Sequence, residues 1–204
     1  MHTPVRHRAS SSRLHRAAGT TVVVLLTAGI AGCSAGDGDA ADDDFRFDGA
    51  TAAGQVISTP ARESAPAFGG ELLDGTAFDS AELAGDVAVL NFWGSWCTPC
   101  RVETPDFQAV YSELRGEGVQ FLGVDVKDQR QLGQAFVDSV GVEYPSLFDP
   151  SGEVALAFRG FPANVVPSTI VLDREGRVAA VYTGAVARED LLAAVTTLLQ
   201  EPEA

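Results

Sequence analysis

Two cysteines separated by two residues follow directly after a long apolar run, and this arrangement constrains the chain more than any other feature. In "NFWGSWCTPC", residues 91–100, Cys97 and Cys100 come just after the run "VAVLNFW". A continuous apolar run of this length predicts a strand buried on both faces. The residues that follow predict a helix from Cys97 to about Arg115, which the glycines at 116 and 118 would end. Cys97 is therefore expected where a buried strand ends and a helix begins.

This position favours redox chemistry at the two thiols. An unperturbed cysteine has a pKa of ~8.5, and the free N–H groups and positive dipole end of a helix N-terminus lower it. We expect Cys97 to attack a substrate disulfide and Cys100, buried one turn later, to resolve the mixed disulfide. Thr98 and Pro99 would set the geometry of the turn between them.

Other uses of the pair are weaker. A structural disulfide across two residues closes too short a loop to restrain the unfolded chain. All three histidines lie within residues 1–32, so no histidine-ligated metal site is expected beyond them. Two thiolates could still hold Cu(I), and a non-catalytic binding module would not need both cysteines. We predict no metal and no cofactor other than a redox-active Cys97–Cys100 disulfide.

The first 32 residues are typical of an export signal. Four arginines and no acidic residue precede the short apolar stretch "TTVVVLLTAGI", which is below the ~20 residues that a lasting membrane helix needs. The following "IAGC", residues 30–33, resembles the lipobox of bacterial lipoproteins. Residues 1–32 are therefore predicted to be a lipoprotein signal peptide, and Cys33 the point of lipid attachment. An ordinary secretory signal is the alternative.

The acidic, Gly- and Ala-rich residues 33–64 are predicted to form a flexible tether, and residues 65–200 the folded domain. Removal of the signal leaves 10 of the 14 basic residues against 28 acidic ones, a formal charge of −18. Such a surface repels nucleic acid and anionic lipid, so no nucleic-acid partner is expected, and membrane attachment would depend on the lipid.

The remaining patterns alternate between strands and helices. We expect a hairpin in "LLDGTAF", a brief helix at "SAEL" capped by Asp79 or Ser80, a second buried strand at 119–126 and an amphipathic helix at 129–141. A short helix near residues 151–158, a hairpin over 168–184 and a final helix at 188–200 follow. The order is β-α-β-α, a helix, then β-β-α, which predicts an α/β fold around one sheet.

Three separated motifs, "FWGSWCTPC", Pro105 inside the first long helix, and "VPST" at 166–169, together resemble the thioredoxin superfamily, in particular its TlpA/ResA-like branch. The resemblance covers about residues 65–200. It implies a thioredoxin fold, with a central mixed β-sheet flanked by helices on both faces, an N-terminal hairpin and a helical insert. A peroxidase of the same superfamily is disfavoured, because residues 90–97 contain neither Pro nor Thr.

The resemblance also implies roles for residues around the thiols. Pro167 would follow a cis peptide bond, and Val166 would present its backbone to an extended substrate. Independently of the resemblance, Trp96 is expected to be a site-flanking aromatic, with a cover over the sulfur that contacts substrate as the alternative. Glu103 would influence proton exchange of the thiols, although a solvated surface glutamate is the alternative. Asn91 departs from the pattern of the superfamily. Many thioredoxins carry a buried Asp at this position that accepts a proton, which Asn cannot do.

The function expected from these features is that of a lipid-anchored, extracytoplasmic thiol–disulfide oxidoreductase. The resemblance suggests a monomeric reductant of exported protein disulfides, apocytochrome c being one candidate, recharged by an integral-membrane electron donor of the thiol-transfer type. A disulfide-forming oxidase of the same fold is the main alternative, because oxidants and reductants share the motif and differ in potential.

Overall fold

The computed structural model describes residues 54–158 and 165–202. The predicted signal peptide, the lipid-attachment residue Cys33 and the first part of the predicted tether lie outside the described residues. Within those two ranges, no helix combines the length and the apolar character needed to cross a membrane.

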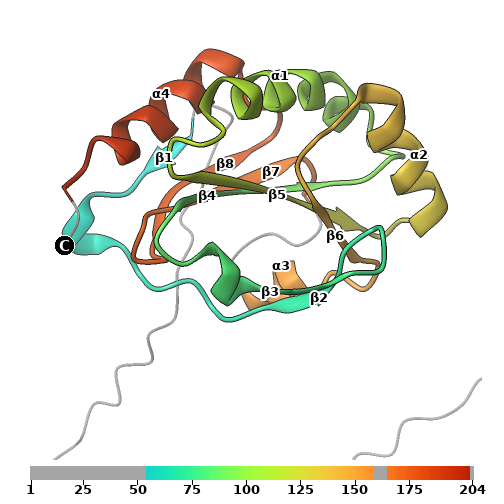
Figure 1. Ribbon diagram of the computed structural model, residues 1–204, viewed down its shortest axis with the longest axis horizontal. Helices are drawn as coiled ribbons and strands as arrows, with labels where there is room; N and C mark the ends of the chain where they lie inside the picture. The colour runs from blue at the N-terminus through green and yellow to red at the C-terminus, as the bar shows by residue number, and fades with distance from the viewer. Residues whose placement is uncertain (1–53, 159–164, 203–204) are drawn as a thin grey trace, which may run out of the picture. The chain divides into compact units, whose positions relative to one another are not determined.

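One mixed sheet forms the centre of the domain (Figure 1), with the strand order β1-β8-β7-β4-β5-β6. The strands are β1 (Gln55–Val56), β4 (Val87–Trp93), β5 (Val119–Val126), β6 (Ser146–Asp149), β7 (Ser168–Leu172) and β8 (Val178–Thr183). β4, β5 and β6 run parallel, whereas β7 is antiparallel to β4 and to β8, and β1 is antiparallel to β8.

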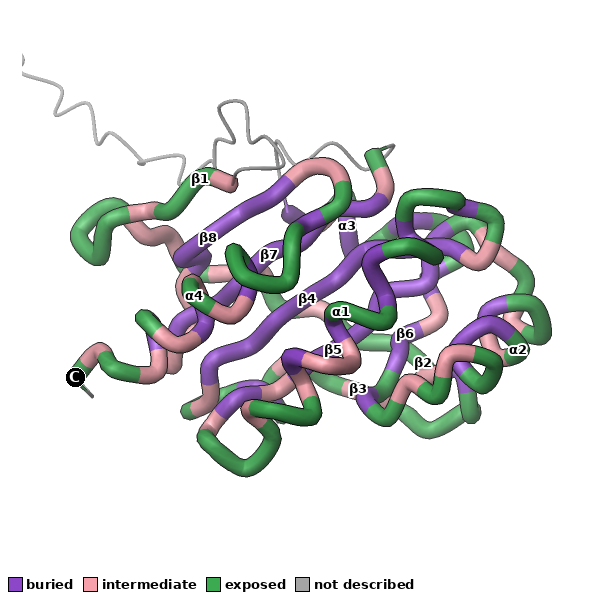
Figure 2. Tube along the Cα trace, turned by 90° about the horizontal axis from the view of Figure 1, so that it is seen from above, coloured by how far each residue is buried: buried purple, intermediate pink, exposed green. Residues whose placement is uncertain are grey.

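Strand β4 can lie at the centre of the sheet because six of its seven residues are apolar. The polar one, Asn91, forms side-chain hydrogen bonds inside the protein. All seven are buried, and Figure 2 shows the buried path continuing through β7 and β8. In the parallel register Trp93 lies opposite Asp125 of β5. The end of β4 therefore delivers the cysteine segment to the same edge of the sheet as the end of β5.

Helices cover both faces of the sheet, as predicted. On one face α1 (Thr98–Leu114) and α4 (Arg188–Leu199) pack through residues such as Phe107 and Leu191. On the other lie the short α3 (Glu153–Ala157) and the hairpin of β2 (Gly69–Glu71) and β3 (Ala77–Asp79), seen below the sheet in Figure 1. Helix α2 (Arg130–Val140) packs near the end of β4, where Phe136 contacts Trp93 with ring centroids 5.3 Å apart.

The domain begins earlier than predicted. We expected the tether to extend to residue 64, but β1 pairs with β8 through Gln55 and Val56, and a 3₁₀ turn, η1 (Thr59–Ala61), follows. Arg62 then binds Asp173 and Glu201 at 3.1 and 2.7 Å. The boundary at residue 65 is therefore wrong, because a two-residue edge strand has no period that a sequence pattern can reveal.

The sequence analysis also did not predict β6. Its four residues, "SLFD", follow Pro145 and are too few for a period, and the strand is defined by parallel pairing with β5. The predicted brief helix is present as the 3₁₀ helix η2 (Ser80–Leu83), and Asp79 rather than Ser80 caps it. Helix α1 continues through Pro105, as predicted.

Candidate active site

Cys97 and Cys100 form a disulfide at the N-terminus of α1. Cys97 is the N-cap residue, and the backbone N–H of Cys100 donates to its sulfur at 3.2 Å. Cys97 is 4% exposed and Cys100 is fully buried. When the bond is reduced, the same N–H and the helix dipole are placed to stabilise a thiolate at Cys97.

Three exposed residues, one just before Cys97 and two between the cysteines, form a rim around the disulfide. The side chain of Trp96 is 54% exposed and lies against Gly94, where a Cβ atom would come within 2.6 Å of the indole nitrogen. Thr98 and Pro99 are also exposed. All three are next to a disulfide cysteine in the chain.

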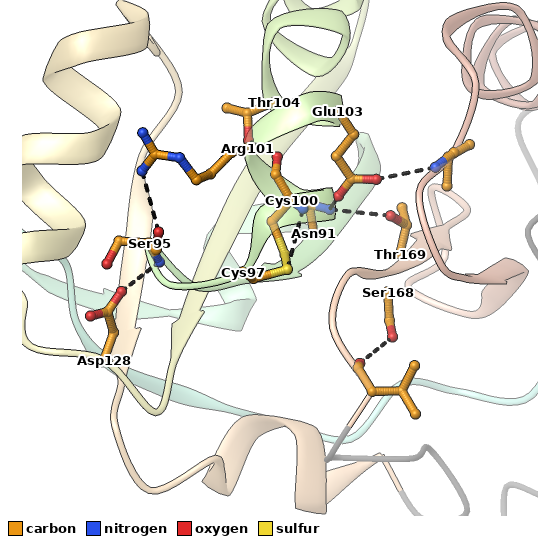
Figure 3. The surroundings of a disulfide bond; sticks show 12 residues. Asn91, Ser95, Cys97, Cys100, Arg101, Glu103, Thr104, Asp128, Ser168 and Thr169 are labelled. Atoms are coloured by element: carbon orange, nitrogen blue, oxygen red, sulfur yellow. Dashed lines mark hydrogen bonds between the residues drawn. A yellow bond between two sulfur atoms is a disulfide. The ribbon is translucent and has the colours of Figure 1, made fainter.

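The segment before β7 lies next to the two sulfurs. The Val166–Pro167 peptide bond is cis, as the resemblance implied. Val166 packs against the apolar cluster that contains Cys97 and Cys100, and Ser168 donates its hydroxyl to the Val165 carbonyl at 2.6 Å. Figure 3 shows Ser168 and Thr169, at the start of β7, on one side of the disulfide, where the Ser168 hydroxyl bonds the Val165 carbonyl and the Thr169 hydroxyl accepts from Asn91.

Glu103 lies inside the protein, so the alternative of a solvated surface glutamate is wrong. Its side chain is 2% exposed and accepts hydrogen bonds from Asn91 Nδ2 at 2.9 Å and from the Val186 N–H at 3.1 Å. Burial raises the pKa of Glu103 from 4.5 to about 7, against the opposing effect of these two hydrogen bonds. Asn91 also donates to Thr169 Oγ1 at 3.3 Å, so its amide joins the helix to β7.

A second group of polar residues was missed from the sequence. Asp128, in the turn after β5, accepts the Ser95 N–H at 2.6 Å, and Arg101 donates to the Ser95 carbonyl at 3.3 Å. Asp125, near the end of β5, is fully buried. An Asp near the end of the mostly apolar run "VQFLGVDV" was the sequence signal that could have identified this group.

Within the described ranges, no three His, Cys, Asp or Glu side chains gather closely enough to hold a metal ion. The described site brings together two sulfurs, a buried carboxyl whose pKa burial raises to about 7, and a segment with a cis peptide bond before β7.

The chain is similar in sequence to known proteins. Residues 61–181 match the AhpC/TSA family. The thiol–disulfide oxidoreductase ResA of Halalkalibacterium halodurans is 33% identical over 129 residues, which cover 63% of this chain and 72% of that protein.

Two solved structures are also similar. A secreted thiol–disulfide isomerase from Corynebacterium glutamicum superposes with a TM-score of 0.72 and 36% identity, covering 76% of this chain and 98% of that one. A DsbF homologue from Corynebacterium diphtheriae gives a TM-score of 0.70 and 34% identity, covering 74% and 98%. These similarities confirm the predicted thioredoxin-like fold.

Proposed function

Because the chain belongs to the AhpC/TSA family of the thioredoxin superfamily, and to the ResA-like thiol–disulfide oxidoreductases within it, we propose that it reduces the disulfides of exported proteins. In this proposal a lipid on Cys33 holds it at the extracytoplasmic face of the cell membrane. The observation that carries the proposal is the Cys97–Cys100 disulfide at a helix N-terminus, beside a buried carboxyl whose pKa is about 7.

The reduced protein begins the reaction with the Cys97 thiolate. The thiolate attacks one sulfur of a substrate disulfide, and the other substrate sulfur leaves as a thiolate that takes up a proton. Cys100 loses its proton and attacks the Cys97 sulfur of the mixed disulfide. The second substrate sulfur leaves, and the Cys97–Cys100 bond forms again. Two electrons have then passed from the protein to the substrate, and the two substrate thiols have gained the proton lost by Cys100 and one proton from solvent.

Glu103 is proposed as the group that accepts the proton of Cys100. It follows Cys100 by three residues, so both lie on one stripe of α1. A base works best when its pKa is near the working pH, and burial gives Glu103 this property. Asn91 cannot accept a proton, but its amide orients one Glu103 oxygen.

Substrate would bind along the edge formed by Val166 and Pro167. Strand addition by an extended peptide uses backbone N–H and C=O groups, which Val166 can offer beside the disulfide. Trp96, Thr98 and Pro99 would contact the substrate from the opposite rim, where they are exposed.

The direction of electron flow is also part of the proposal. From the resemblance to the TlpA/ResA-like branch, we propose a reductant recharged by an integral-membrane electron donor of the thiol-transfer type, with apocytochrome c as a candidate substrate. A disulfide-forming oxidase is the second candidate, because oxidants and reductants of this fold share the CxxC motif and differ in reduction potential.

Reduction of insulin by dithiothreitol tests the chemistry. The wild-type protein should accelerate the reaction, Cys97→Ser should not, and Cys100→Ser should accumulate a mixed disulfide that mass spectrometry detects. An equal rate for wild type and Cys97→Ser would reject the proposed activity.

Two measurements in cells test the direction of electron flow and the lipid anchor. The Cys97–Cys100 pair should be mostly reduced in cells, whereas a mostly oxidised pair would favour the oxidase. Radiolabelled palmitate should attach to the wild type and not to Cys33→Ala, and labelling of both or of neither would reject the anchor.

A further inference from the structure

Asp125 is a buried carboxyl that the proposed exchange reaction does not use. It is fully buried, and neither of its oxygens accepts a hydrogen bond from a described N–H or O–H group. Burial raises the pKa of Asp125 to about 8, helped by the charge of Asp128 and by a side-chain hydrogen bond to it, and opposed by the charge of Arg130. Two ionised carboxylates cannot form that bond, but a protonated Asp125 can donate to Asp128.

The surrounding backbone closes around the Asp125 carboxyl. Gly133 of α2 approaches so closely that a Cβ atom there would lie 2.2 Å from Asp125 Oδ2. Lys127 adopts a left-handed conformation, with φ of 54°, in the turn that leads from Asp125 to Asp128. The helix thus excludes water from Asp125, and the turn brings Asp128 back toward the cysteine segment.

Asp128 connects this carboxyl to the active site. Its Oδ2 accepts the Ser95 N–H at 2.6 Å and its Oδ1 accepts the Gln129 N–H at 2.7 Å. Ser95 precedes Cys97 by two residues, so their Cα atoms lie within about 7 Å. In Figure 3 Asp128 and Glu103 lie on opposite sides of the disulfide.

The pKa of Asp128 is lowered in spite of its burial. Burial acts to raise it, but the Ser95 and Gln129 hydrogen bonds and the bond with Asp125 outweigh that effect. Asp128 is therefore the ionised partner, and Asp125 carries the proton.

We propose that Asp125 and Asp128 hold one proton between them and position the segment before Cys97 through the Ser95 N–H, so that retention of this proton and reduction of the Cys97–Cys100 disulfide favour each other. Both residues are positioning residues in this scheme, since neither touches substrate. The inference rests on the proposed thiol–disulfide exchange.

The coupling has an electrostatic cause. Reduction places a negative charge on the Cys97 sulfur, two residues after the Ser95 N–H that the Asp128 carboxylate accepts. Loss of the Asp125 proton would add a second buried negative charge and disfavour the thiolate. By reciprocity, the thiolate must raise the pKa of Asp125 by the same free energy.

Arginines of α2 and α1 are the charged groups that lie beside the pair. Arg130 of α2 favours ionisation of Asp125, but its guanidinium is already bonded to the Leu72 and Leu73 carbonyl oxygens and to Glu71 of β2. Arg101 of α1 binds the Ser95 carbonyl. Trp93 of β4, opposite Asp125 in register, carries no charge.

Infrared titration of the full-length wild-type protein tests the shared proton. Labelling with [4-¹³C]aspartate distinguishes Asp125 from Glu103, which would also be partly protonated near pH 7. We expect an aspartic-acid C=O band that persists to about pH 8, titrates at higher pH in the reduced than in the oxidised protein, and is absent in Asp125→Asn. Absence of this band in the wild type above about pH 6 would overturn the proposal.

The redox equilibrium with dithiothreitol, measured from about pH 6 to pH 9.5, tests the coupling. Relative to Asp125→Asn, the wild-type disulfide should become about fivefold harder to reduce at the alkaline end, because only the wild type gains the second anion. Asp138→Asn, an exposed position on α2, should follow the wild type. A ratio between wild type and Asp125→Asn that stays constant with pH would overturn the coupling.

The two proposals fail separately. If the wild type does not accelerate insulin reduction, the proposed function fails, whereas the infrared band is measured without any substrate. If insulin is reduced but the band is absent, the shared proton alone is rejected.

Discussion

Replacing Glu103 by Gln should change how the stability of the protein depends on pH. Glu103 is 2% exposed, and burial raises its pKa from 4.5 to about 7. One pKa unit corresponds to about 1.4 kcal/mol, so ionised Glu103 makes the folded state about 3 kcal/mol less stable than protonated Glu103 does. A neutral Gln of the same shape avoids this loss.

The direction of the effect follows from the raised pKa. The stability associated with protonated Glu103 is fully present below pH 4.5 and is lost as the pH rises through about 7. Wild type and Glu103→Gln should therefore unfold with similar free energies near pH 4.5, and the variant should be about 3 kcal/mol more stable near pH 8.5. Asp125 also titrates in this range, but it is present in both proteins and cancels in the difference.

Urea unfolding of the oxidised protein at a series of pH values measures this difference. Asn91 can turn its amide to accept a hydrogen bond from the introduced side-chain amide, while the Val186 N–H keeps an oxygen acceptor, so the variant should fold. Glu117→Gln, exposed beyond the end of α1, is the matched control and should show no such trend. A difference between wild type and Glu103→Gln that does not change with pH would refute the reasoning.

Two further predictions concern the N-terminal segment and the exposed rim. Arg62→Ala should lower the free energy of unfolding by about 2 kcal/mol, because the 3%-exposed Arg62 side chain pairs with Asp173 and Glu201, while Arg177 still pairs with Asp173 in the variant. Urea unfolding measures this loss, and a value below about 0.5 kcal/mol would contradict the prediction. Trp96→Ala should change stability by less than about 0.5 kcal/mol, because the side chain is 54% exposed. Its KM for a peptide disulfide should rise about fivefold, and an unchanged KM would remove Trp96 from the substrate surface.

The redox pair and its position at a helix N-terminus could be predicted from the sequence, because they depend on residues close together in the chain. The apolar run of β4 followed by two cysteines predicted a strand that ends at a helix N-terminus, and the structure confirms it. The helices α1, α2 and α4 and the hairpin of β7 and β8 were predicted for the same reason. Each is long enough for its apolar period to stand out.

Short elements at the sheet edges could not be read in this way. β1 has two residues and β6 has four. Each is defined by its pairing with a longer strand, β1 with β8 and β6 with β5. The isolated pattern of such a segment resembles a loop. The position of the domain boundary depended on this pairing, and the prediction failed there.

By itself, the sequence determined which groups can perform chemistry at this site, since two thiols at a helix start and a glutamate one turn later are set by local spacing. The tertiary structure alone decided their environment. Glu103 titrates near neutrality because β4, β7 and the loop before α4 enclose it, and Asp125 becomes a buried acid because α2 packs on it through Gly133. A pKa depends on the burial and charges that surround a group in space, and those are supplied by segments far away in the chain.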